Sequence, residues 1–433
     1  MDKFQISDNL VNEKIRDILY IACNMGKLIL QNGGETYRAE ETIIRTCAHY
    51  GIKTNSFATL NTIITSTDLF ENRQEDSMYT VVDRINFRTI NLEKVSELNN
   101  LARNLNNYTI EELKEKIKSI NNQSKIDRLK KVTGHVLAGG AFALLFKGGI
   151  RDSIVAIISM LLLSFFDKYL REKKLNSFFT NLVGAMFVTV ITLIFYSAGF
   201  INDFSTASIA ALMLLAPGIS FTNSIRDIIA GDFISGISRG AEAVAVGVAL
   251  AAGSGMILSI LLELASKVAK ESAGVIAFYP TYGENLVYLR FIKEILLAIL
   301  ATLGFGILFG IKNKKLFFAS ISGGLGWFFY IFALHINLSA SIGFFFGSLS
   351  MTVYSEVMAR KLKAPAITFL IGGLIPLVPG SGVYYTMYNL LTNEFDKALK
   401  NGVDSLLCAG AIGIGILIGS TLCQMFYSNI KNR

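Results

Sequence analysis

Long apolar runs separated by short polar stretches fill the chain from residue 132 to its end. A helix needs about 20 predominantly apolar residues to cross a bilayer. Ten runs approach that length, which predicts an α-helical polytopic membrane protein. The predicted spans are residues 133–149, 152–167, 178–196, 206–223, 240–262, 294–311, 316–334, 338–356, 366–389 and 402–426.

The first 130 residues have a different pattern, in which apolar and polar residues recur at the spacing of amphipathic helices and strands. Apolar residues recur at helical spacing between Ile15 and Ile29, and the Gly33-Gly34 break separates them from a second helical stretch. Strand-like alternation follows, and then two more helical stretches. We predict a cytoplasmic α+β domain of order ααββαα, with helices at 15–29 and 35–50, strands at 56–66 and 78–90, and helices at 92–105 and 109–120.

The membrane part of the chain repeats itself. A shift of about 162 residues places each of the first five spans on one of the second five, and it places Pro217-Gly218 on Pro379-Gly380. Because each half has an odd number of spans, the halves must run in opposite directions, as in transporters built from an inverted repeat. The predicted boundaries are 1–130 for the cytoplasmic domain, 131–264 for the first half, 265–288 for a linker and 289–433 for the second half.

Composition supports the membrane assignment and changes the meaning of the net charge. Mean hydropathy is +0.47 and only 17% of the residues are charged, which is more apolar than a soluble core requires. The formal charge of +8 comes largely from Lys and Arg in short loops, so it does not indicate nucleic-acid binding. Two predicted exterior loops, near 198–206 and 335–338, contain neither residue. With no signal peptide in residues 1–20, this bias places the N-terminal domain and the C-terminus in the cytoplasm and the spans in the plasma membrane.

The sequence lacks the motifs of an enzyme or of a nucleotide-driven pump. It contains no G-x-x-x-x-G-K-[ST] loop and no G-x-G-x-x-G after a predicted strand. Cys23, Cys47, Cys408 and Cys423 have no metal-binding spacing, and we interpret them as reduced structural thiols. We therefore expect no catalytic residue, no metal and no cofactor.

Prolines and glycines interrupt two of the predicted spans. The first break is Pro217-Gly218, and the second lies at Pro376–Gly380. Proline removes a backbone donor and glycine relaxes the backbone, so N–H and C=O groups become available to a solute. We interpret the breaks as the centre of a transporter; the alternative is two kinked helices with an interfacial aromatic belt at Tyr384, Tyr385 and Tyr388. The candidate substrate-binding residues are Pro217, Gly218, Asn223, Pro379, Gly380, Ser381 and Tyr385.

Charged residues follow the first break closely. Asn223, Arg226 and Asp227 have the spacing of one helical face, and three more charges follow within four turns. Charges this close to hydrocarbon are expensive unless they are paired or face water, which favours a gate or a substrate and proton site. The alternative is an ordinary cytoplasmic loop with Arg226 and Arg239 as anchors and solvated acids. The candidate gating or proton-coupling residues are Arg226, Asp227, Asp232, Arg239, Glu242 and Glu356. For Glu356, which lies beside Arg360, we give at least equal weight to an alternative in which the side chain extends to the membrane surface.

One segment of the cytoplasmic domain is distinctive, at the start of its second predicted helix. Its residues are Glu35, Thr36, Tyr37, Arg38 and Glu41. Acidic residues near a helix start, with Glu35 and Arg38 three residues apart, suit an ordinary helix N-terminus. On the residues alone we prefer that structural interpretation. We interpret His49 as a packed or surface residue, and for His135 we prefer a packing role to titration near neutral pH.

Three passages resemble the threonine/serine exporter family. They are NGGETYRAEETI at 32–43, LLAPGISFTNSIRDIIAGDFISGISRGAE at 214–242 and LIGGLIPLVPGSGVYYTMYNLL at 370–391. The first two resemble the family's larger component, a cytoplasmic domain with five spans, and the third resembles its smaller five-span component. The chain therefore looks like a fusion of both. Gly34 and Ala39 depart from the family's pattern, and neither departure changes a charge.

The resemblance implies a secondary exporter of small polar metabolites that is driven by the proton motive force. Fused members imply threonine or serine as the substrate, and split relatives imply dicarboxylates such as succinate. By motif position, the family pattern maps onto Glu35, Thr36, Tyr37, Arg38, Glu41, Pro217, Gly218, Asn223, Arg226, Asp227, Gly231, Asp232, Gly236, Arg239, Glu242, Pro376, Pro379, Gly380 and Ser381.

The sequence leaves other functions open. A dicarboxylate exporter and a passive facilitator would share the architecture, and a sensor or assembly module would use the membrane part only as an anchor. Ten spans with an internal repeat are more than an anchor requires. The expected partners are a small-molecule substrate, protons and the lipid bilayer, with no nucleic acid; assembly into a homo-oligomer stays open.

Overall fold

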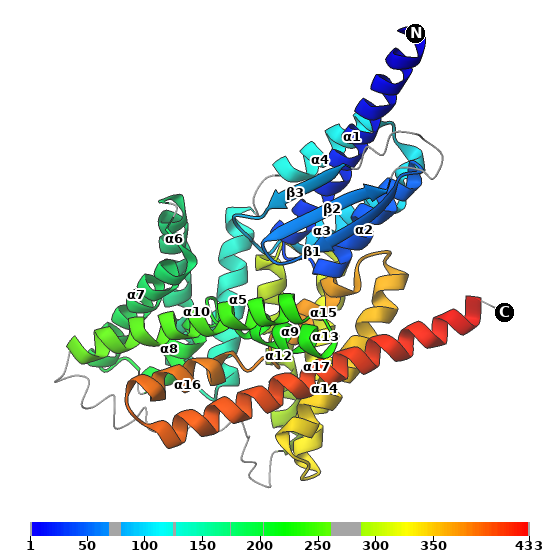
Figure 1. Ribbon diagram of the computed structural model, residues 1–433. Helices are drawn as coiled ribbons and strands as arrows, with labels where there is room; N and C mark the ends of the chain where they lie inside the picture. Colours follow the sequence, from blue (N-terminus) through cyan, green and yellow to red (C-terminus); the bar gives the residue numbers. More distant parts are fainter. Residues whose placement is uncertain are drawn as a thin grey trace. The chain divides into compact units, whose positions relative to one another are not determined.

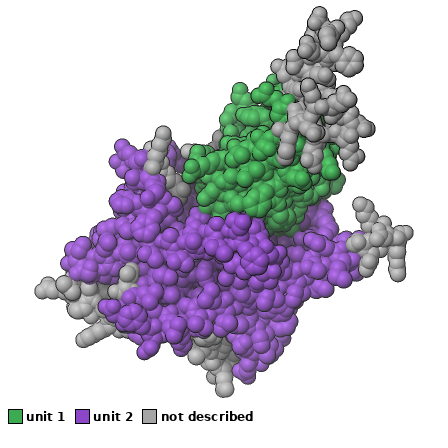
Figure 2. All heavy atoms as spheres, in the orientation of Figure 1, with its two compact units in different colours: residues 1–126, 309–311, 363–368 green, residues 127–308, 312–362, 369–433 purple. Residues whose placement is uncertain are grey.

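The computed structural model describes residues 2–68, 79–123, 127–173, 175–201, 203–260 and 287–431 (Figure 1). The chain divides into two compact units (Figure 2). Unit 1 comprises residues 1–126, 309–311 and 363–368, and unit 2 comprises residues 127–308, 312–362 and 369–433.

Unit 1 has an α+β fold with its own apolar core. The helical spacing between Ile15 and Ile29 forms a buried face of the first helix, which packs against the second helix and the sheet. A capping box begins the last helix, because Glu112 N donates to Thr109 Oγ1 at 3.2 Å and Thr109 N donates to the Glu112 carboxylate at 2.8 Å. The described elements are α1 (Asp2–Gln31), α2 (Thr36–His49), β1 (Lys53–Ala58), β2 (Thr62–Asp68), β3 (Thr80–Arg84), α3 (Leu92–Arg103), the 3₁₀ helix η1 (Leu105–Asn107) and α4 (Ile110–Asn122).

The described part of unit 1 contains a three-stranded antiparallel sheet of order β1-β2-β3, so the prediction of only two strands is wrong. The predicted strand at 56–66 spans a turn between β1 and β2. Thr59 closes that turn, since its N–H donates to Thr62 O at 2.8 Å and Thr62 N donates to its hydroxyl at 3.1 Å. The polar and apolar alternation continues across this turn, and a threonine at the corner gives no Gly or Pro signal.

Two cysteines lie in the core of unit 1. Cys23 and Cys47 are fully buried and form no disulfide. Burial raises the pKa of the Cys23 thiol to about 11 and that of Cys47 to about 12. Both are therefore protonated thiols at neutral pH.

We expect neither Cys23 nor Cys47 to react with a maleimide in the folded protein, because the thiolate is the reactive form and both sulfurs are shielded. Mass spectrometry after brief labelling, with and without denaturant, tests this. Modification of either cysteine before unfolding would contradict the packing described for α1 and α2.

The helices after residue 127 form two series that correspond one to one. The starts of α15, α16 and α17 each follow those of α8, α9 and α10 by 162 residues, the offset predicted from the sequence. The first series is α5 (Arg128–Leu145), α6 (Ile150–Glu172), α7 (Ser177–Ser197), α8 (Phe204–Leu212), α9 (Gly218–Ile229) and α10 (Phe233–Ile260). The second is α12 (Val287–Leu308), α13 (Asn313–His335), α14 (Ala340–Lys361), α15 (Ala366–Leu374), α16 (Gly380–Leu391) and α17 (Phe395–Lys431).

Seven helices in the described residues are long and apolar enough to cross a membrane, so the chain is a polytopic helical membrane protein. They are α6, α7, α10, α12, α13, α14 and α17. The other three predicted spans correspond to α5 and to the broken pairs α8/α9 and α15/α16, and the ten-span count stays a prediction. The linker predicted for 265–288 falls mostly on residues 261–286, which lie outside the described residues.

One predicted boundary is wrong in a way that matters for function. The fifth span was expected to begin at residue 240, but α10 begins at Phe233. Asp232 begins this helix early, because its carboxylate accepts a hydrogen bond from Ser235 N at 3.2 Å. Arg239 therefore lies within a helix and not in a loop.

Candidate functional site

The two proline–glycine breaks lie against each other. Pro217 is the N-cap of α9, and Pro379 is the N-cap of α16. A Cβ atom on Gly218 would lie 2.0 Å from Val378 Cγ1 and 3.1 Å from Gly380 Cα, so any side chain there would force Val378 to move. A Cβ on Gly380 would in turn lie 3.2 Å from the Cβ of Ala216. Two segments 162 residues apart in sequence thus form one crossing.

In each series, the short helix after the break packs on the apolar core of the other series. Ile219, at the start of α9, packs on the cluster that contains Leu377, Val378 and Ile412. Tyr384 of α16 packs on the cluster that contains Leu212, Val246 and Leu250. Both series are needed to build the crossing.

Two helix N-termini meet at the crossing. The first N–H groups of a helix have no acceptor within the helix, and they carry the positive end of its dipole. In α9 the first turn closes with Phe221 N donating to Pro217 O at 2.9 Å, and in α16 it closes with Val383 N donating to Pro379 O at 3.3 Å. Ser381 is buried within this first turn of α16. The arrangement suits a carboxylate or another small anion.

A buried ion cluster lies beyond the crossing, on helices α9 and α10 of the first series. Arg226 Nη2 lies 3.1 Å from Asp227 Oδ1, and Arg239 Nε lies 2.9 Å from Asp227 Oδ2. Asn223, Arg226 and Asp227 share the buried face of α9, with 7%, 7% and 8% of their surface exposed. The alternative of a solvated loop is therefore wrong for Arg226, Asp227 and Arg239. One carboxylate holds two guanidinium groups and joins α9 to α10.

The remaining acids of this region occupy helix α10 and its start. Asp232 caps α10, as described above, and Glu242 lies half-buried one turn beyond Arg239. The sequence did not single out Ser224, whose hydroxyl donates to Gly236 O at 2.6 Å and gives α9 and α10 a second link.

The tyrosines of α16 form a contiguous group. The Tyr384 ring lies 5.4 Å from that of Tyr385 and 6.0 Å from that of Tyr388. The Tyr385 hydroxyl is buried, and the described residues give it no hydrogen bond of good geometry. Buried hydroxyls normally have a partner, so this group has the capacity to bind water or solute. A similar buried hydroxyl on Thr222, next to Asn223, was not predicted.

Glu356 is engaged on its own helix. Arg360 Nη1 lies 2.9 Å from its carboxylate, and the Arg360 guanidinium lies 4.0 Å from the centre of the Tyr427 ring. This pair joins α14 to α17. No contact recorded for the described residues links it to Asp227.

The motif at residues 35–41 begins α2 in unit 1. Glu35 is its N-cap, Glu35 and Thr36 are buried, and Tyr37 is half exposed. Glu41 pairs with Arg38 at 3.0 Å and with Arg45 at 2.9 Å. Burial opposes the charge of Arg38, but the neighbouring Tyr37, Glu35 and Glu41 outweigh it and raise the pKa of Arg38. These contacts stabilise the first turns of α2, and the role of the motif stays a prediction.

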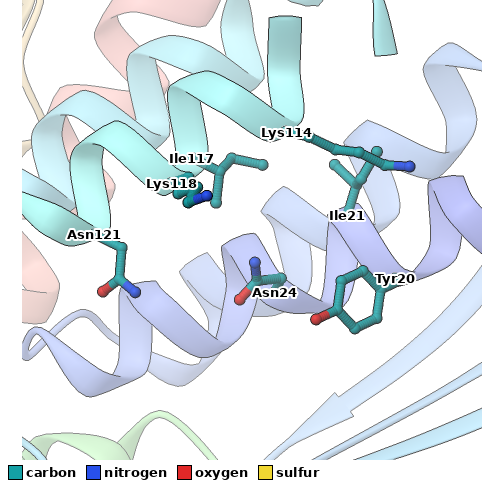
Figure 3. A pocket seen from close by; sticks show the side chains of 7 residues that line it. All are labelled: Tyr20, Ile21, Asn24, Lys114, Ile117, Lys118 and Asn121. Carbon is teal, nitrogen blue, oxygen red and sulfur yellow. The ribbon is translucent and has the colours of Figure 1, made fainter. Parts of the chain in front are cut away.

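A shallow hollow of about 300 Å³ lies between α1 and α4 in unit 1 (Figure 3). Lys114 on its rim already pairs with Asp17 at 2.5 Å, and its floor includes the buried Ile21 and Ile117. We assign it no ligand. Its lining residues are Tyr20, Ile21, Asn24, Lys114, Ile117, Lys118 and Asn121.

Two family models match the chain. The one described as "Putative threonine/serine exporter" matches residues 20–261, and the one described as "Threonine/Serine exporter, ThrE" matches residues 294–422. The first match covers more than half of the chain and includes α9 and the cluster around Asp227. The second includes α16 and the break at Pro379.

Curated relatives point in the same direction. The threonine/serine exporter of Corynebacterium glutamicum is 24% identical over 425 residues, which cover 95% of this chain and 84% of the relative. A "Probable threonine/serine exporter" of Mycobacterium tuberculosis is 21% identical over 57% of this chain and 46% of its own length. An uncharacterized protein of Haemophilus influenzae is 22% identical over 32% of this chain and 50% of its own length. No solved structure matches the chain significantly.

Proposed function

The chain belongs to the threonine/serine exporter family, a family of transporters, and we propose that it exports threonine, serine or a similar small polar metabolite by secondary transport driven by the proton motive force. The observation that carries this proposal is the contact between Gly218 and Gly380. It joins the breaks of two corresponding helices at one point, which is where transporters of this design bind their solute.

The proposed architecture is a 5+5 inverted repeat with ten spans. Support comes from the two corresponding helix series and from the reciprocal packing of α9 on α17 and of α16 on α10. In this arrangement α8/α9 and α15/α16 each count as one broken span. The N-terminal domain of residues 1–130 and the C-terminus then lie in the cytoplasm, and a linker near 265–288 lies outside.

The crossing suits a zwitterion. We assign the substrate carboxylate to the N–H groups that begin α9 and α16, near Gly218 and Ser381. The ammonium group would then face the acid on α10. Glu242 is less than two turns from Gly247, where a Cβ would lie 3.0 Å from Val383 Cγ1 of α16. Asn223 and Tyr385 would supply neutral hydrogen bonds.

A dicarboxylate is the second candidate, and the ion cluster disfavours it. A second carboxylate would need Arg226 and Arg239. In the structure both guanidinium groups already bind Asp227. A dicarboxylate would have to displace that side chain, whereas an amino acid would not.

Proton coupling is assigned to Asp227 and Glu242. Protonation of Asp227 would remove the charge that holds two arginines, and it would loosen the link between α9 and α10. Asp232 and Glu356 would affect only the gating movement of the helices. Asp232 caps α10, and Glu356 pairs with Arg360.

Uptake of radiolabelled threonine, serine and succinate into proteoliposomes tests the substrate assignment. We expect threonine and serine to enter and each to compete with the other, while succinate does not. Entry of succinate alone would favour the dicarboxylate exporter. No entry of any of the three would remove the substrate assignment.

A further inference from the structure

The two helix series make the same turn after their broken spans. Between α9 and α10, Asp232 N donates to Asp227 O at 2.9 Å; between α16 and α17, Glu394 N donates to Asn389 O at 2.8 Å. Each turn passes through a left-handed residue, Gly231 with φ +92° and Asn393 with φ +61°. Every residue of the second turn lies 162 positions after its counterpart.

The helices on either side of these turns also pack in the same register. A Cβ on Gly240 of α10 would lie 2.8 Å from Ser224 Oγ of α9, and a Cβ on Gly402 of α17 would lie 3.3 Å from Thr386 Cγ2 of α16. Gly240 corresponds to Gly402, and Ser224 corresponds to Thr386, again at the offset of 162. The two helix pairs are therefore copies of one local structure.

This correspondence gives each residue of the ion cluster a counterpart. Asn389 occupies the position of Asp227, and Asn401 occupies the position of Arg239. Asn389 is as buried as Asp227, with 8% of its surface exposed. Tyr388 stands at the position of Arg226, so the second copy has lost both arginines and the central carboxylate. The outlying acids persist, as Glu394 for Asp232 and Asp404 for Glu242.

We propose that Asn389 and Asn401 form a neutral outer gate, the counterpart of the charged inner gate made by Asp227 and Arg239. The inference rests on the proposed function, because an inverted repeat places the two turns at opposite ends of the transport path. Both gates close by drawing the helix after the break against the long helix that follows it. They differ in the groups that opening separates, which are ions at the inner gate and neutral side chains at the outer gate.

Charge sets that difference. Opening the inner gate separates buried ions, which is costly in a low-dielectric interior. Opening the outer gate separates two neutral side chains and no ions, so its net cost is small. Opening of the inner end therefore requires the loss of these ion pairs, while the outer end opens without breaking any. The control of export lies at the inner end.

A reversible cross-link tests the position of the outer gate. Asn389→Cys with Asn401→Cys is prepared in a cysteine-free background that is first shown to transport, and a short bis-thiosulfonate reagent joins the two thiols. We expect cross-linking to lower threonine flux about tenfold and reductant to restore it. The matched control is Phe395→Cys with Leu399→Cys, two exposed positions on α17 alone, for which the reagent should leave flux within about twofold.

Failure to cross-link the first pair, or full flux after cross-linking confirmed by mass, would overturn the proposal. If the unmodified protein carries no solute, the proposed function itself fails, and that outcome is separate. Because the cross-linked protein is compared with itself after reduction, a folding defect cannot imitate the expected result.

A second variant tests the neutrality of the gate. Asn389→Asp with Asn401→Arg places the inner ion pair at the outer end, and we expect flux to fall about tenfold while each protein remains monodisperse with an intact thermal transition. Unchanged flux in this folded double variant would overturn the claim that the outer gate must be neutral.

Discussion

Replacement of Gly218 by valine is expected to abolish export while the protein still inserts into the membrane. Even a single Cβ would collide with Val378 at 2.0 Å and would lie 3.1 Å from the backbone of Gly380. Overpacking of this kind typically costs about 1–3 kcal/mol. Here it would force apart the two breaks whose contact forms the proposed site. Flux in proteoliposomes and the thermal transition of the purified protein measure both effects.

Gly255→Val is the matched control for this experiment. Gly255 lies on α10, and a Cβ there would meet no atom within 4 Å. The same chemical change should therefore leave both flux and stability near their original values. Normal export by the Gly218→Val protein would show that the close contact with Gly380 is not required.

Replacement of Asp227 by asparagine is expected to have the second large effect. The change is nearly isosteric, but it leaves Arg226 and Arg239 as buried charges without their shared carboxylate. Removal of one partner of a buried ion pair costs about 3–5 kcal/mol. We expect a lower thermal transition and loss of coupled flux, measured on the same preparations.

Asp17→Asn provides the comparison for the loss of an ion pair. Asp17 pairs with Lys114 at 2.5 Å, but both side chains are about half exposed. Exposed pairs contribute only about 0–1 kcal/mol. If the two aspartate variants were equally stable and equally active, the cluster on α9 and α10 would have no special role.

The sequence was a good guide to the helices and a poor one to their ends. Apolar runs of membrane length predicted the long helices, and the offset of 162 residues recurs in the starts of α8, α9 and α10 and of their counterparts. The turn at Thr59 was missed, because a threonine hydroxyl closes it and no Gly or Pro marks it. The start of α10 was placed too late, because its first turns contain Asp232 and Arg239 and are too polar for a hydropathy pattern.

For the candidate site, local chemistry was predictable and long-range contacts were not. Pro217 and Pro379 interrupt the helical hydrogen bonds locally and begin α9 and α16, so the sequence locates both breaks. The contact of Gly218 with Gly380 depends on how two distant segments pack, and spacing along one helix carries no information about that. For the same reason the sequence grouped Arg226 with Asp227 but gave no sign that Arg239 binds the same carboxylate.

Coupled accumulation of the substrate tests proton-driven export most directly. The purified protein in proteoliposomes is given labelled threonine with and without an imposed pH gradient, and the Gly218→Val protein serves as the inactive reference. We expect threonine to accumulate above its external concentration only with the gradient and only with the original protein. Equal, gradient-independent equilibration by the original protein would contradict proton-coupled export and would identify a passive facilitator.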